Sequence, residues 1–384
     1  MPESPILSGR LIFQYLYDVG GDIEMEKIPK EKFTLVERPK KRGDRILAPR
    51  HEEVGLIPLE VDLGAVKIDK HRAMVEGKIF SIGVVEISIS VEFRKLTFDG
   101  LIRLTGLNEG KVKFEGKDVD FDEIPLKFMM DVKKEISKII VHPYPTVEQP
   151  QVYTTVVITE SDPRLDAQDF LTKFRKQTAG VLRGEKEWRE LSGKEVEDAL
   201  KAYLSYTDDD IIIVDWYSSL ISGAVDYMDD FLGILELALI QLLELRTYDR
   251  LLDIKTTEAY LATRTLVRKR PGFVWGRQYM GLMRTMRELA EFRIEITDLI
   301  EDARNIQKLT GEWYLGKLYR LAGERFRISE WLTTVDRKLE RLEDLYGMVV
   351  ERIDIQRSTS MEILTLLLIF LIVMLEVLMV VGRI

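Results

Sequence analysis

The chain has 384 residues, which is enough for two or three modest domains, and it combines a net charge of -9 with a mean hydropathy of -0.08. This acidic balance argues against a protein whose whole surface coats nucleic acid, although it allows a local basic patch. The absence of cysteine excludes disulfides, zinc–thiolate sites, iron–sulfur clusters and thiol catalysis, and we expect no cofactor.

The first 155 residues are predicted to form a β-rich α/β domain. The clearest strand is Val85–Phe93, where apolar and polar residues alternate so that one face is buried. Further strands are predicted at residues 11–19, 58–68 and 151–160, and helices at residues 97–107 and 124–140.

Residues 156–222 are predicted to connect this domain to a helical region at residues 223–360. In the connector, Pro163 marks a helix start, Ser192 caps a second helix, and residues 211–216 form a short apolar strand. Beyond Gly223 we expect no strand, and long helices are predicted at residues 224–252, 256–269, 276–309, 312–327 and from 329 onward.

The last predicted helix carries an apolar stripe that recurs every three or four residues and includes Trp331, Leu342 and Val349. Such a stripe needs a partner helix, and the region is expected to form an antiparallel bundle and a coiled-coil stalk. The pattern leaves two partners open, because either the chain's own helices or a second copy of the chain would bury the stripe.

The segment 363–381 is predicted to be a single transmembrane helix within a terminal region of residues 361–382. Its 19 residues span about 28 Å as a helix, close to the ~30 Å hydrocarbon core of a bilayer. Its apolar residues contribute about -4.5 to -9 kcal/mol on insertion, which outweighs a cost of about +2.5 to +3.5 kcal/mol for Glu376. The amino terminus has no signal-peptide pattern, so residues 1–360 are expected in the cytoplasm, joined to membrane lipid by a tail anchor.

Glu376 allows two interpretations. A carboxylate inside an apolar helix usually faces a partner or water, which predicts that it packs between helices of a homo-oligomer. The alternative is that it lies close enough to the helix end to reach the aqueous interface.

Two acidic clusters are the nearest approach to a catalytic or metal site. Asp208, Asp209 and Asp210 precede a strand, and clustered carboxylates can hold Mg²⁺ or act as acid and base. A polar turn explains them equally well. The alternating acids at residues 118–122 resemble a calcium loop, but Glu123 and Met129 replace the glycine and glutamate that such a loop needs.

Basic residues gather in two places where anionic lipid or RNA is a candidate partner, and a solvated connector is the alternative. One is a loop at residues 38–45. The other is a helical region with few acids, which includes Arg264, Arg268, Lys269, Arg270 and Arg277.

The helical segments 232–253 and 313–378 resemble the C-terminal half of the "required for meiotic nuclear division" family. The resemblance rests on the Trp331 helix, the Lys338-Leu339 pair, Glu362, and Glu376 followed by valine in the last helix. It implies a membrane-anchored, oligomer-forming protein without known catalytic residues. Eukaryotic members are mitochondrial and support organellar translation, whereas the absence of a transit peptide here implies a prokaryotic cytoplasmic membrane.

Together these patterns predict an α+β protein with an N-terminal β-rich domain, C-terminal long helices and one transmembrane helix. The first function hypothesis is a non-enzymatic, tail-anchored scaffold that self-associates through its helical region. The alternatives are a stalk or regulatory component of an ion transporter, similar to magnesium channels, and a carboxylate-dependent enzyme. Binding to nucleic acid or ribosomes through the basic region is a further possibility.

Overall fold

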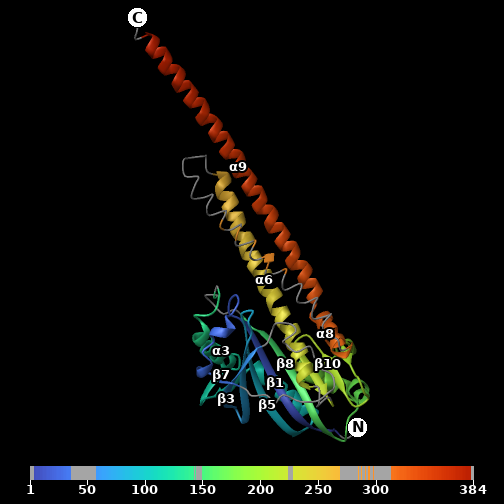
Figure 1. Cartoon of the computed structure of the whole chain (residues 1–384). Helices are drawn as coiled ribbons and strands as arrows, with labels where there is room; N and C mark the ends of the chain where they lie inside the picture. The colour runs from blue at the N-terminus through green and yellow to red at the C-terminus, as the bar shows by residue number, and fades with distance from the viewer. Residues whose placement is uncertain are drawn as a thin grey trace. The chain divides into compact units, whose positions relative to one another are not determined.

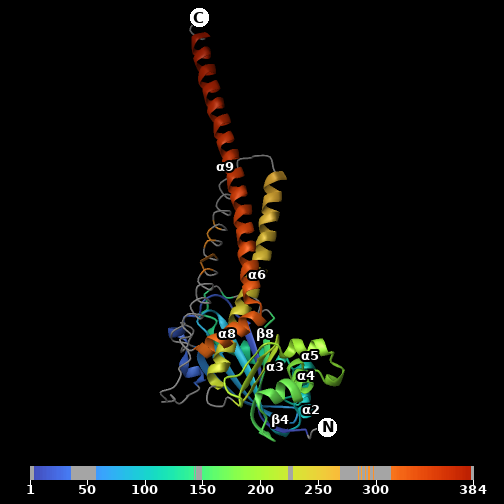
Figure 2. The same ribbon diagram turned by 90° about the vertical axis from the view of Figure 1, so that its right-hand side faces the viewer.

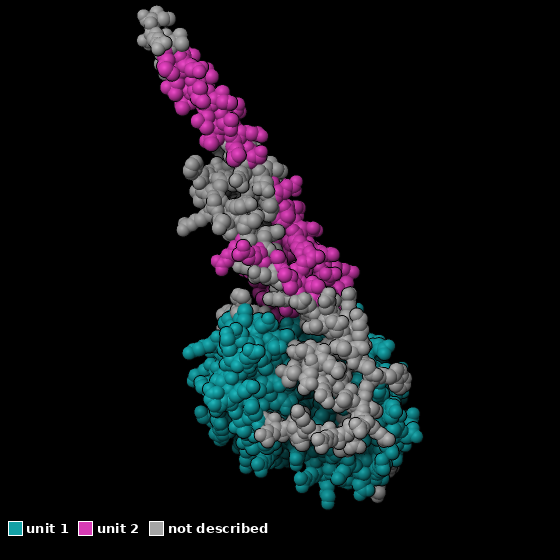
Figure 3. All heavy atoms as spheres, in the orientation of Figure 1, with its two compact units in different colours: residues 1–245, 301–330 teal, residues 246–300, 331–384 magenta. Residues whose placement is uncertain are grey.

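The computed structural model divides into two compact units, which Figure 3 colours separately. Unit 1 comprises residues 1–245 and 301–330, and unit 2 comprises residues 246–300 and 331–384. The residues described are 4–35, 58–141, 143, 149–223, 228–268, 284, 287, 290, 293–294, 297 and 313–381.

Unit 1 contains a sheet of eleven described strands, in which ten run in the order β7-β6-β3-β4-β5-β1-β8-β11-β10-β9 and β2 pairs with β3 (Figure 1). The pairing is antiparallel except between β8 and β11. The strands are β1 (Ile6–Asp18), β2 (Thr34–Leu35), β3 (Leu59–Ile68), β4 (His71–Ile79), β5 (Val84–Leu96), β6 (Lys111–Phe114), β7 (Lys117–Asp120), β8 (Gln151–Asp162), β9 (Tyr203–Leu204), β10 (Ile211–Val214) and β11 (Ser218–Ser222).

The alternation in β5 places its apolar residues in the main core and confirms the strand predicted from the sequence. Ile89 and Val91 lie opposite Phe13 and Leu11 of β1, and all four side chains are fully buried. Side chains of a strand alternate between two faces, so the residues between them lie on the opposite face of the sheet.

Helices cover the core face of the sheet. The described helices before α6 are α2 (Phe98–Thr105), α3 (Glu123–Ile136), α4 (Arg175–Arg183) and α5 (Gly193–Leu200), with short helical turns η1 (Met25–Lys27), η2 (Lys30–Lys32), η3 (Gly106–Glu109), η4 (Asp169–Lys173) and η5 (Trp188–Glu190). Figure 2 shows α2, α4 and α5 gathered together, and Phe98 of α2 stacks on Phe174 at 5.4 Å between ring centres. Thr97 and Ser192 cap α2 and α5, and the cap at Ser192 confirms the one predicted from the sequence.

The opposite face of the sheet packs against the first part of α6 (Met228–Arg268), where Met228 and Leu232 contact Ile12 and Val157. Two helices were predicted for this stretch, yet α6 continues through residues 253–256 without a break. Thr257 donates a hydrogen bond to the carbonyl of Asp253 at 2.9 Å, which ties the expected gap into helical geometry.

The remaining described helices are α8 (Trp313–Arg325) and α9 (Ile328–Val381). Within unit 2, Val335, Leu339 and Leu342 of α9 are buried by the chain itself. Lys338 forms ion pairs with Asp249 at 2.6 Å and Asp253 at 2.8 Å, and so joins α9 to α6 inside this unit.

The fold is α+β, with a β-rich sheet in the N-terminal part and helices at the C-terminus, but the predicted membrane segment is wrong. Among the residues that the structure describes, none of the helices combines the length and the apolar character that crossing a membrane requires. The prediction summed transfer free energies for residues 363–381 as an isolated segment, whereas the structure continues them from the charged helix that begins at Ile328. The tail anchor, the single-pass topology and the membrane location are corrected with it.

Candidate functional site

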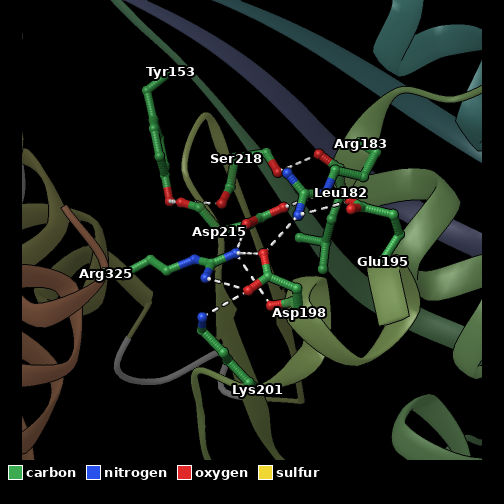
Figure 4. Close-up of polar contacts among 9 residues, drawn as sticks. All are labelled: Tyr153, Leu182, Arg183, Glu195, Asp198, Lys201, Asp215, Ser218 and Arg325. Atoms are coloured by element: carbon green, nitrogen blue, oxygen red, sulfur yellow. Dashed lines mark hydrogen bonds and ion pairs between the residues drawn. The ribbon is translucent and has the colours of Figure 1, made fainter. Parts of the chain in front are cut away.

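Four charged side chains from separate elements of unit 1 meet beside the end of β10 (Figure 4). We call them the arginine clamp: Arg183, Asp198, Asp215 and Arg325. Arg183 ends α4, Asp198 lies in α5, Asp215 follows β10, and Arg325 ends α8. Segments that lie up to 142 residues apart in the chain therefore converge on one point, since Arg183 and Arg325 both reach the same two carboxylates.

Asp215 is the innermost member of the clamp, with only 2% of its side chain exposed. One carboxylate oxygen accepts a hydrogen bond from Arg325 Nη2, and the other lies 3.1 Å from Arg183 Nε. The turn that carries Asp215 is fixed by its own backbone, because its N–H donates to the carbonyl of Ser218 at 2.7 Å. The buried Tyr153 hydroxyl donates to the same carbonyl at 2.7 Å.

Asp198 lies nearer the surface, and three cationic side chains donate hydrogen bonds to its carboxylate. Its Oδ2 accepts hydrogen bonds from Arg183 at 2.9 Å and Arg325 at 3.0 Å, and its Oδ1 accepts one from Lys201 at 2.6 Å. The hydrogen bonds from Arg325 and then Lys201 lower the pKa of Asp198 below its usual range. Its carboxylate therefore stays ionised wherever the protein is folded near neutral pH.

The arginine clamp joins α4, α5, the turn after β10 and α8, and it does not present a reactive group. All the carboxylate oxygens of Asp198 and Asp215 face cations, so none is directed at a metal ion or a substrate. Across the described parts of the chain, no group of three or more His, Asp or Glu side chains is arranged to bind a metal. Removing one partner of a buried ion pair costs about 3–5 kcal/mol, so the clamp resists separation of α8 from the sheet.

The acidic run at residues 208–210, a weak metal or catalytic candidate in the sequence, forms a turn. Asp210 accepts hydrogen bonds from the backbone of Tyr206 at 2.6 Å and Thr207 at 3.2 Å. Asp209 pairs with Arg164 at 2.9 Å on the surface, and the carbonyl of Asp208 accepts from Ala167 at 2.8 Å. This geometry gives the carboxylate-enzyme hypothesis no support.

Gly223 allows the chain after β11 to lie in direct contact with the turn at residues 208–210. It has a φ of +77°, and a Cβ at this position would lie 1.9 Å from the carbonyl oxygen of Asp209. Only glycine accommodates both the left-handed backbone and the close approach. The position of the three aspartates is therefore determined by the close contact between the end of β11 and the turn that precedes β10.

The acids at residues 118–122 are also separated by the fold. Asp118 and Asp120 lie in β7, with exposed side chains. Asp122 precedes α3 and accepts a hydrogen bond from the hydroxyl of Tyr15 at 2.7 Å. These residues do not form a common oxygen cage.

The residues predicted to mediate assembly fall in different environments. Leu342 is fully buried inside unit 2, Trp331 is half-buried, and Glu376 is exposed. The side chain of Val349 lies outside the described residues. The structure thus places the exposed part of α9 beyond the predicted stripe.

The predicted basic patch lies outside what the structure describes. Arg264 and Arg268 belong to α6 by their backbone, but their side chains are not described. Lys269, Arg270 and Arg277, with the basic loop at residues 38–45, lie outside the described residues altogether. Binding of nucleic acid or ribosomes stays a prediction.

Sequence reasoning missed the clamp almost entirely. Asp215 lies near the end of the predicted apolar strand 211–216, but Arg183, Asp198 and Arg325 occupy ordinary helical positions with nothing unusual beside them. A buried arginine is recognised only when its carboxylate partners are known, and these are 110 and 127 residues away in the chain. No local pattern carries that information.

Residues 8–228 match the family model described as "Uncharacterized protein MJ0711, N-terminal domain". A curated relative, "Uncharacterized protein MJ0711" of Methanocaldococcus jannaschii, is 28% identical over 186 residues, covering 48% of this chain and 53% of the relative. The chain therefore spans about half the length of the relative it matches. No solved structure matches the chain. The clamp's two acids and Arg183 lie inside the matched region, and Arg325 lies beyond it.

This match overturns the resemblance to the "required for meiotic nuclear division" family. The supported similarity lies in the N-terminal part of the chain, not in the C-terminal third where that resemblance was drawn. The earlier interpretation rested on apolar spacing in long helices, and unrelated helices that pack on one another share this spacing. The mitochondrial and membrane associations that it implied are withdrawn.

Proposed function

The chain belongs to the family of the MJ0711 N-terminal domain, and we propose that it is a non-enzymatic scaffold that self-associates through the C-terminal part of α9. The observation that carries the proposal is a run of exposed apolar side chains, which we call the apolar segment and define as residues 361–379. The apolar segment carries few charges, since Glu362 and Glu376 are its charged residues.

The apolar segment is exposed on every side of the helix. Fifteen of its large apolar side chains are between 49% and 66% exposed. The consecutive residues Leu367, Leu368, Ile369 and Phe370 are all more than half exposed, and four successive positions of a helix point in four directions about 100° apart. Burial by a single neighbouring helix would leave much of this surface uncovered.

The free energy gained by burying the apolar segment favours contact with several neighbouring helices over contact with one. Complete burial of such a side chain is worth about 1.5–3 kcal/mol, so fifteen half-exposed side chains leave roughly 10–20 kcal/mol unrealised. In a dimer each helix covers about a third of the other's segment, so the two together recover roughly 7–13 kcal/mol, which lies within the about 4–15 kcal/mol that association costs, and two thirds of each segment stay uncovered. We therefore expect more than two copies in the assembly.

A second copy of the chain is the partner that fits this surface. It presents an apolar helix of the same length and the same near-absence of charge, and the exposed apolar area exceeds what a soluble monomer usually carries. A hydrophobic face shared by identical chains is the ordinary basis of a closed homo-oligomer. The charge of Glu376 fits at the edge of such an interface or between copies.

The test is the mass of the full-length protein in solution as a function of concentration, measured by light scattering and mass photometry. The informative variant is Leu367→Glu with Ile369→Glu, which puts carboxylates about 200° apart on the helix, so that at least one meets any interface. We expect the wild type to be oligomeric and this variant to dissociate at least tenfold more readily. The matched control is Met348→Glu with Tyr260→Glu, which adds the same charge at two exposed apolar positions outside the segment.

A wild-type protein that is monomeric at every concentration would contradict the proposal. Equal dissociation of the control pair would show that added charge, and not loss of the apolar segment, drives the change. Catalytic turnover by the protein would contradict the non-enzymatic part alone.

A further inference from the structure

A row of polar side chains crosses the sheet face that α6 covers, where an apolar layer would be expected. Ser219 donates to Thr155 at 3.1 Å, Thr155 donates to Gln14 at 3.2 Å, and Gln14 donates to Glu86 at 3.1 Å. Lys78 of β4 lies opposite Glu86 of β5 in the register. We call this the buried polar row, and its members are Lys78, Glu86, Gln14, Thr155 and Ser219, one from each of five neighbouring strands.

A carboxylate from α6 covers one end of the buried polar row. Glu236 accepts hydrogen bonds from Lys78 Nζ at both oxygens, at 2.7 and 2.6 Å. Glu236 and Glu86 are each 1% exposed, and the side chain of Lys78 is 15% exposed. Lys78 is therefore the paired cation of Glu236.

Among the described residues, Glu86 has no comparable cation of its own. Its Oε1 accepts from Gln14, whereas its Oε2 is buried and receives no hydrogen bond from the described residues. The groups that act on Glu86 are Lys78 from β4, Gln14 from β1 and Glu236 from α6, and Glu60 of β3 lies opposite Lys78. If Glu86 were ionised, its carboxylate would face the buried carboxylate of Glu236, while Lys78 already bonds both oxygens of Glu236, and a buried charge without its own counter-ion is very costly.

We infer that the Glu86–Glu236 pair binds one proton at neutral pH, that Glu86 carries it, and that this proton is required to seat the first part of α6 on the sheet. With the proton on Oε2, Glu86 changes from an acceptor into a donor toward Glu236, and the three groups sum to zero charge. The inference concerns unit 1 alone and does not depend on self-association.

The electrostatic environment of the pair supports this assignment. Burial, and then repulsion by Glu236, raises the pKa of Glu86 well above its ordinary value, and the attraction of Lys78 does not offset them. Burial lowers the pKa of Lys78, but the charge of Glu236 leads the opposing causes and the net pKa is raised, so the amine stays charged.

The direction of the pH dependence follows from the raised pKa. The folded protein holds a proton that the unfolded chain releases above the ordinary pKa of glutamate, about 4.3. The stabilising contribution of the pair is complete below that value and declines as pH rises toward the folded-state pKa of Glu86. Stability of unit 1 should therefore fall as the solution becomes more alkaline.

The test uses the full-length protein and two readouts. Infrared spectroscopy at neutral pH should show the carbonyl band of a protonated carboxyl group, and this band should be absent from Glu86→Gln. The urea midpoint of the wild type should fall between about pH 5 and pH 8, and Glu86→Gln should lose most of this decline. Glu92→Gln is the control, because it lies on the same face of β5 with 74% of its side chain exposed.

A second variant distinguishes a glutamate that binds a proton from a glutamate that only stabilises the fold. In Glu236→Gln, Glu86 becomes the counter-ion of Lys78 and should ionise, so the infrared band should disappear although Glu86 is still present. A wild type without the band at neutral pH would overturn the inference. So would a pH decline of the urea midpoint that is the same in Glu86→Gln as in the wild type.

Discussion

The guanidinium groups of Arg325 and Arg183 each contact both carboxylates of the arginine clamp, and Arg325 is the more deeply buried of the two. Its side chain is 2% exposed, whereas Arg327, two residues later, is 57% exposed. Both guanidinium groups lie over the ring of Trp216, at 5.4 and 5.0 Å from its centre. The two arginines therefore share a neighbour and differ mainly in burial and in carboxylate partners.

Replacing Arg325 with methionine should destabilise unit 1 by about 3–5 kcal/mol, because it leaves Asp215 buried with one cation instead of two. Arg327→Met should cost less than about 1 kcal/mol, since its pair with Glu330 is exposed. Urea unfolding followed by tryptophan fluorescence measures both. Equal losses in the two variants would show that stacking on Trp216, and not the clamp, is the main contribution.

The side chains of β5 show what residue-level patterning predicts and what it does not. The alternation in Val85–Phe93 correctly identifies which residues enter the main core. The alternation gives no reason to expect that Glu86 is buried, because the polar face of a strand is normally exposed to water. Glu86 is buried because α6, which starts more than 140 residues later, covers that face, and a period of two carries no information about a distant helix.

At the scale of elements, α4 and the turn η5 approach each other closely through Gly180. A Cβ on this residue would lie 2.5 Å from the Cβ of Trp188. Trp188 cannot easily retreat, since its indole N–H donates to Asp99 at 2.7 Å and its ring is nearly buried. The glycine is therefore a packing requirement in spite of its poor helix propensity.

Gly180→Ala should consequently destabilise the protein by about 1–3 kcal/mol, although alanine favours a helix in isolation. The control is Gly193→Ala at the start of α5, where no atom lies within 4 Å of the added methyl group. That substitution should be neutral or slightly stabilising. Thermal unfolding by circular dichroism compares the two, and a neutral Gly180→Ala would mean that Trp188 moves aside freely.

Elements with strong local signals were predictable, and those defined by pairing were not. The caps at Thr97 and Ser192 mark helix starts that the structure contains. The strand β11 was missed, because its sequence SSLIS has few β-branched residues and is fixed by pairing with β8 and β10. A helix end was also predicted at residue 252, whereas α6 continues through that position.

At the scale of the whole molecule, the two compact units are held by different interactions. Unit 1 has a large sheet core, and unit 2 relies on contacts such as the pairing of Lys338 with Asp249 and Asp253. The stability of a protein is not uniform, and separate cooperative units open independently. The two units should therefore respond separately to substitutions inside each.

Lys338→Met should raise amide hydrogen exchange in the unit 2 part of α6 around residues 249–253 and leave the sheet of unit 1 unchanged. The reason is that methionine keeps the apolar stem but removes the cation shared by two acids. Arg337→Met, one position away and exposed, is the control. A rise in exchange that spread equally through β1 and β5 would contradict independent units.

The composition of unit 1 from residues 1–245 and 301–330 was not predictable from apolar periodicity. Periodicity reports that a helix has a buried face and does not say which element buries it. The predicted boundaries therefore assigned the stretch around α8 to the helical region, whereas Arg325 and Phe326 pack with Asp215 and Tyr153 of the sheet.

The return of α8 to the sheet has a consequence for the order in which the protein is made. Asp215 is synthesised 110 residues before Arg325, which at about 5–20 residues per second is roughly 5–20 s of translation. For that interval the nascent chain holds a carboxylate whose second cation does not yet exist. The part of the sheet around β10 should therefore be completed only after α8 has left the ribosome, so that cotranslational folding of this family domain is finished by a segment outside it.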